Sequence, residues 1–170
     1  MVGGPADHGA VLSSRDELIA LFREWAPWEF RASPLYATLS PLVADDDALL
    51  DLIEQRRPGI HPTVLFFGAV HHLVLGDPDE GLAAFFPSVV GDAAAPVEEA
   101  GPVFQAFCSD HLDELAELVR TRMVQTNVVR RAVALRYGLT HVAADRPVHL
   151  VEVGASAGIL LRQDLSLIHI

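Results

Sequence analysis

The feature that most constrains the fold is a stretch near the end of the 170-residue sequence, residues 148–158. Its letters are VHLVEVGASAG: mostly apolar residues and an acid, followed by a turn of glycine, alanine and serine. The pattern predicts a buried strand, a tight loop and a helix start, because glycines let the backbone turn sharply and approach a ligand. Free N–H groups at such a helix start favour an anionic or nucleotide-like ligand. The loop comes so late that its sheet has hardly begun when the sequence stops.

The residues before this stretch carry helical patterns. Ser14–Glu17 have the sequence of a capping box, and apolar residues at helical spacing follow up to Pro27, which we expect to end the helix. Ser33-Pro34 and the acidic run 45–47 predict two further helix starts. Residues 56–59 predict a turn.

The later helical patterns are longer. The most apolar helix is expected over residues 61–75, and a short helix over 82–86. Residues 87–101 are rich in Pro, Gly and Ala and predict a linker or surface loop. One long helix is predicted over 102–124, and another from a cap at 126–127 to Gly138.

These patterns together predict a mainly α chain. A flexible leader (1–12) precedes a helical N-terminal domain (13–146), which leads into the first strand–loop–helix (147–164) of a truncated α/β, Rossmann-like domain. All 12 basic residues are arginine, which is typical of a GC-rich bacterial genome. The last residues, 165–170, depart from this style and match a translated frame of a sequencing-library adapter. We therefore expect that tail not to be native.

Composition excludes several classes of function. The formal net charge of −11 argues against sequence-independent binding to nucleic acid or to an anionic membrane. The single cysteine, Cys108, permits no intramolecular disulfide and indicates a reducing compartment. The N-terminus has no signal-peptide pattern, and the longest apolar run, 64–75, is too short to span a bilayer. We therefore expect a cytoplasmic protein with no nucleic-acid or membrane partner.

The glycine loop fits two motifs. Residues 154–158 match G-x-S-x-G, the nucleophile elbow of α/β-hydrolases. With Glu152 two residues earlier, the loop also resembles the first motif of S-adenosylmethionine-dependent methyltransferases, with Ser156 in place of the middle glycine. An elbow follows several strands of its sheet, whereas the methyltransferase motif lies on the first strand. Because only helices are predicted before residue 147, the strand at 148–153 would be the first of its sheet. The methyltransferase-like interpretation is therefore favoured over the elbow and over a purely structural glycine turn.

On this interpretation S-adenosylmethionine is held by Glu152, Gly154, Ala155, Ser156 and Gly158. The carboxylate at the strand end would bind the amino-acid portion of the cofactor, directly or through water. Such enzymes work largely by positioning the acceptor, so neither a catalytic residue nor the methyl acceptor can be named, and we expect the fragment to be inactive alone. The alternatives are a non-catalytic nucleotide-binding or purely structural protein and, less favoured, a serine hydrolase.

A polar cluster before the loop is a second candidate. It consists of Gln125, Thr126, Asn127 and Arg130. The cluster would line the cofactor or substrate pocket, or it forms a capped turn with solvated arginines. No metal site is expected, because Cys108 with His111, and the histidines at 61, 71 and 72, are better explained by packing and hydrogen bonding.

Several segments resemble an uncharacterised family of bacterial proteins known as a domain of unknown function. The segments are Ser33–Tyr36, Phe85–Ser88, Phe104–Cys108, Val124–Asn127 and Val151–Gly158. The resemblance covers residues 15–164 and implies a helical half joined to a Rossmann-like, methyltransferase-like half. Family members are longer than this chain, so the resemblance implies an N-terminal fragment. It supplies neither a substrate nor an activity.

Overall fold

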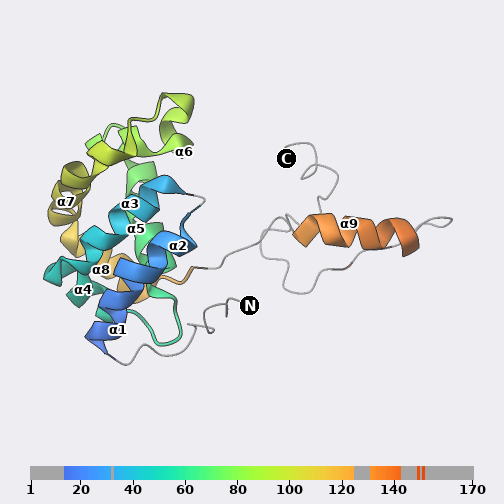
Figure 1. The fold of residues 1–170 in the computed structure, drawn as a ribbon, viewed down its shortest axis with the longest axis horizontal. Helices are drawn as coiled ribbons and strands as arrows, with labels where there is room; N and C mark the ends of the chain where they lie inside the picture. The colour runs from blue at the N-terminus through green and yellow to red at the C-terminus, as the bar shows by residue number, and fades with distance from the viewer. Residues whose placement is uncertain (1–13, 32, 125–130, 143–148, 150, 152–170) are drawn as a thin grey trace. The chain divides into compact units, whose positions relative to one another are not determined.

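A computed structural model of the chain describes residues 14–31, 33–124, 131–142, 149 and 151. The chain divides into two compact units, Met1–Val124 and Gln125–Ile170 (Figure 1). Every regular element among the described residues is a helix, and no strand occurs among them. The predicted mainly α character is confirmed. In the same described part, no helix is both long and apolar enough to cross a membrane.

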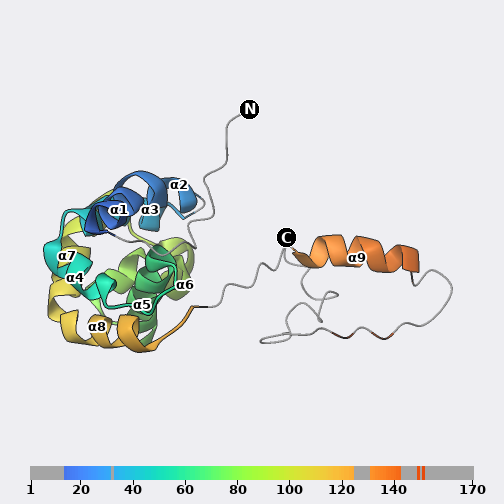
Figure 2. The same cartoon turned by 90° about the horizontal axis from the view of Figure 1, so that it is seen from below.

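The first unit is a succession of short and medium helices. In chain order they are α1 (Arg15–Ala20), the π-helical turn η1 (Leu21–Trp25), α2 (Ala26–Glu29), α3 (Pro34–Ala44), α4 (Asp47–Glu54), α5 (Pro62–Gly76), the 3-10 helix η2 (Gly81–Phe85), α6 (Pro87–Val90), the 3-10 turns η3 (Gly91–Ala93) and η4 (Val97–Glu99), α7 (Ala100–Asp110) and α8 (Leu112–Thr121). Figure 2 shows α1, α2 and α3 on one side of this unit and α5 and α8 on the other. The second unit contains α9 (Arg131–Val142).

The first helical segment begins as predicted but does not end at Pro27. The Ser14 hydroxyl accepts a hydrogen bond from the Glu17 backbone N–H at 3.2 Å and caps α1. The backbone then widens into η1, where the N–H of Ala26 bonds to the carbonyl of Leu21, and continues as α2 through Pro27. A proline ring clashes with the carbonyl one α-helical turn earlier and offers no N–H. The wider π-helical turn accommodates both defects.

The next two helices begin where predicted, with different caps. Pro34 is the first residue of α3, but the Ser33 side chain makes no capping hydrogen bond. Asp46 caps α4, because its carboxylate accepts the Leu49 backbone N–H at 3.1 Å. Within the acidic run, Asp46 therefore satisfies one of the backbone N–H groups that lack a partner at the start of α4.

The predictions for residues 87–124 were partly wrong. The predicted surface loop contains α6, η3 and η4, and α7 starts at Ala100. The predicted long helix is broken at His111 (φ −111°, ψ 24°), so α7 and α8 are separate helices and α8 ends at Thr121. The break lets α7 pack on α3 and η2 while α8 packs on α4 and α5. Tertiary packing has overridden a continuous helical pattern.

The helix predicted to end at Gly138 also continues. α9 runs to Val142, and Gly138 is not among the described glycines with positive φ. A glycine terminates a helix when it adopts the left-handed conformation, and Gly138 does not do so. The predicted cap at Thr126 or Asn127 lies outside the described residues.

The core of the first unit is organised around α5. This helix carries no charged residue, and its Phe66 and Phe67 side chains are buried. Phe67 contacts four rings from other helices or their flanks, those of Phe22, Phe30, Tyr36 and Phe104. The contacts include edge-to-face geometries, which add specificity to the apolar burial. Aromatic side chains thereby link η1, the end of α2, α3 and α7 to α5.

Candidate functional site

The predicted cofactor loop falls in the second unit. Its residues Glu152, Gly154, Ala155, Ser156 and Gly158 lie outside the described residues, as do Gln125, Thr126, Asn127 and Arg130. Of the predicted strand, only His149 and Val151 are described; both lie outside regular secondary structure, and Val151 is 82 % exposed. The loop and its strand remain predictions.

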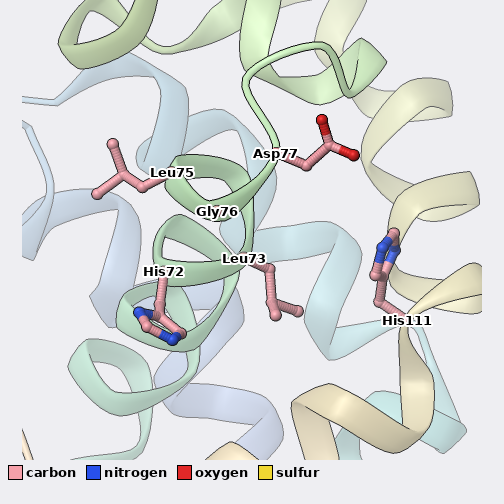
Figure 3. Close-up of a pocket in the computed structure, with 6 residues that line it drawn as sticks. All are labelled: His72, Leu73, Leu75, Gly76, Asp77 and His111. Atoms are coloured by element: carbon pink, nitrogen blue, oxygen red, sulfur yellow. The ribbon is translucent and has the colours of Figure 1, made fainter.

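The described part of the first unit offers a different candidate, a surface hollow at the C-terminal end of α5. Its volume is about 430 Å³, within the range of small-molecule sites. The hollow is lined by His72, Leu73, Leu75, Gly76, Asp77 and His111 (Figure 3). Sequence reasoning missed it, because His111 comes from the α7–α8 junction and reaches α5 only through the tertiary fold.

The hollow has an apolar floor and polar walls. In Figure 3 the Asp77 and His111 side chains lie on one side, with Leu73 between them and His72. The His111 ring stacks on Phe107 at a centroid distance of 4.4 Å, and its Nδ1 lies 3.0 Å from the Phe107 carbonyl oxygen. A neutral imidazole that donates its Nδ1–H to this carbonyl keeps Nε2 as a hydrogen-bond acceptor.

The neighbouring histidine, His71, has other partners. Its Nε2 lies 2.8 Å from the Ser88 hydroxyl, and its ring stacks on Phe86 at 5.0 Å. Burial lowers the pKa of His71. An imidazole beside a serine is the arrangement of a general base and a nucleophile. Among the described residues, however, no carboxylate or carbonyl accepts a hydrogen bond from Nδ1. The contact is therefore best explained as a structural hydrogen bond between α5 and α6.

Two of the segments that carry the family resemblance lie in contact next to the His71–Ser88 hydrogen bond. The rings of Tyr36 and Phe86 have a centroid distance of 6.0 Å, which brings Ser33–Tyr36 and Phe85–Ser88 together. Burial raises the pKa of Tyr36 to about 12. A neutral phenol packed among aromatic rings serves the core, so this corner is structural rather than catalytic.

The described residues contain no group of three or more His, Cys, Asp or Glu side chains placed to hold a metal ion. Cys108 is buried; burial, together with the charge of Asp46, raises the pKa of its thiol to about 12. The thiolate required for metal binding is therefore disfavoured. His61 lies with its Nδ1 3.0 Å from the Thr63 hydroxyl.

Comparison with protein families gives a match over most of the chain. A family model described as "Uncharacterized protein conserved in bacteria (DUF2332)" matches residues 20–168. Comparison with curated proteins gave no significant match. Comparison with solved structures also gave none.

Proposed function

The chain belongs to the DUF2332 family of uncharacterized bacterial proteins, and within that family we propose that it binds S-adenosylmethionine as a methyltransferase-like protein. The observation that supports the proposal is the order of residues 152–158, an acid at the end of an apolar segment followed by G-x-S-x-G. The family match includes these residues.

Each proposed ligand has a physical role. Gly154 and Gly158 lack a Cβ, so the backbone N–H groups between them can come close to the cofactor. The Glu152 carboxylate would receive the ammonium group of the cofactor's methionine portion, and the Ser156 hydroxyl adds one hydrogen-bonding group to the loop. When bound, S-adenosylmethionine supplies an electrophilic methyl group on a sulfonium. The protein's part is to fix that group and its acceptor in line.

The polar cluster Gln125, Thr126, Asn127 and Arg130 is proposed for the acceptor side of the site. These residues belong to the same compact unit as the loop, Gln125–Ile170. Amide, hydroxyl and guanidinium groups can orient a polar acceptor without reacting themselves. The acceptor's chemical class is left open by this set, which carries both donors and acceptors.

A serine hydrolase is the second candidate, because the same five residues match the nucleophile elbow. An elbow needs earlier strands of its sheet, and residues 14–124, as far as the structure describes them, supply helices only. The two candidates differ in the reactivity of Ser156. A fluorophosphonate probe should label an elbow serine and leave a cofactor loop unlabelled.

The proposal is tested by calorimetric titration of S-adenosylmethionine and S-adenosylhomocysteine into the protein expressed from its complete genomic reading frame. We expect saturable binding that Gly154→Val abolishes, since the valine side chain blocks close backbone approach. Gly138→Val is the matched control, because nothing lies within 4 Å of the position of an added Cβ there. Absence of binding, or equal loss in both variants, would contradict the proposal, as would binding of ATP alone.

A further inference from the structure

We propose that the hollow at the C-terminal end of α5 is a binding site for a small organic cation, an alkylammonium group. The site lies in the first compact unit, and the inference does not rest on the proposed cofactor loop. Three features carry it: helix carbonyls without α-helical donors, a carboxylate without an ion-pair partner, and an apolar floor.

The first feature is the end of α5. The last carbonyls of a helix lack N–H partners unless the following residues supply them. Residue 78 is proline and has no N–H for the Val74 carbonyl. The next two N–H groups are directed elsewhere, that of Asp79 to the Asp77 carboxylate (3.2 Å) and that of Glu80 to the Asp77 carbonyl (3.2 Å). The Asp77 N–H still bonds to the Leu73 carbonyl (3.1 Å), but the carbonyls of the last three residues of this 15-residue helix, at its negative end, lack their α-helical donors.

The second feature is the charge of the lining. Asp77 contributes a carboxylate, no basic residue occurs in the last turn of α5, and neither lysine nor arginine lines the hollow. In the described part of the chain no ion pair involves Asp77. A carboxylate next to a helix C-terminus is a repulsive arrangement, and a cation relieves it.

The third feature selects an organic cation over a metal ion. Leu73 and Leu75 line the hollow, and Leu75 is 53 % exposed. A divalent metal gains nothing from leucine side chains, and the described residues offer no metal-binding group of three. An alkylammonium can place its charge on the Asp77 carboxylate, donate to the His111 imidazole and lay its chain on the leucines.

The test follows the imidazole C–H signals of His72 and His111 by NMR while n-butylamine is titrated at about pH 8, where the amine is charged. About 0.15 M salt suppresses long-range attraction to the acidic chain. The variants are Asp77→Asn and, as the matched control, Asp79→Asn in the same loop. An asparagine at position 77 can still accept the Asp79 N–H, so the turn is retained.

We expect saturable shifts of both imidazoles, a loss of affinity of about tenfold in Asp77→Asn, and a change below about twofold in Asp79→Asn. The uncharged analogue n-butanol should cause no saturable shift. An equal loss of affinity in the two variants would show that only the net charge of the protein matters, and would overturn the proposal. A linear, unsaturable response, or saturation with n-butanol, would overturn it as well.

Discussion

Two adjacent histidines of α5 have different environments in the fold. His71 is half-buried, stacks on Phe86 and hydrogen bonds to Ser88, whereas His72 is exposed and lines the hollow. The sequence could not show which of the two histidines is buried. Because α5 is apolar on nearly all sides, its pattern does not distinguish a buried face from an exposed one. Their difference arises from Phe86 and Ser88, which contact His71, whereas His72 is left exposed.

This difference predicts a pH dependence of stability. Burial places the folded-state pKa of His71 below its ordinary value of 6.5, so the folded protein disfavours the imidazolium. The associated stability is present above pH 6.5 and is lost as the pH falls through the folded-state pKa. No residue of α5 or of the covering segment, Gly81–Val90, carries a charge that could offset the effect.

In urea unfolding at a series of pH values, His71→Gln should flatten the acid loss of stability seen in the unsubstituted protein. A glutamine can keep a hydrogen bond to Ser88 but does not titrate. His72→Gln, at the exposed neighbour, should keep the original pH dependence. If the two variants behave alike, burial of His71 is not the cause.

At the scale of the elements, helix starts with a side-chain cap were predictable, whereas two of the helix ends were not. Caps such as Ser14 and Asp46 act on N–H groups two or three residues away, so the sequence alone contains them. Pro27 was predicted to end a helix that a π-helical turn carries past it, and His111 breaks a pattern that predicted one helix. Both outcomes depend on what the helix packs against, which local sequence does not specify.

The ion pairs between helices also could not be predicted from local sequence patterns. Arg15, at the start of α1, forms ion pairs with Asp47, Asp51 and Glu54 on α4. Hydrogen bonds to Asp47 and then Asp51 are the main cause of a raised pKa of Arg15. The three acids lie at helical spacing, so the sequence indicated a shared face of α4 but not its partner.

The caps of α3 and α4 give a matched pair of predictions. Asp46→Ala should lower the free energy of unfolding by about 1 kcal/mol, because the Leu49 N–H loses its acceptor. Ser33→Ala should cost less than about 0.5 kcal/mol, since the Ser33 side chain makes no capping hydrogen bond. Denaturant unfolding of both variants measures the two values, and a larger effect at Ser33 would contradict this assignment of the caps.

At the scale of the whole molecule, helical periodicity predicted the mainly α chain, and the resemblance of several segments pointed to its family, whose model matches residues 20–168. The hollow could not be predicted, because its walls come from the end of α5 and from His111 between α7 and α8. The proposed cofactor loop is the opposite case: five residues that are close in sequence suggest it, and local patterns are the ones that a sequence reveals best.

The most direct test of the central claim is hydrogen–deuterium exchange measured with and without S-adenosylhomocysteine. Binding at the glycine loop should slow exchange in peptides that cover residues 148–160, because bound backbone N–H groups are protected. Peptides from α5 should exchange at unchanged rates. Protection confined to residues 14–124, or none in the loop at a saturating ligand concentration, would contradict the assignment of residues 152–158 as the cofactor site.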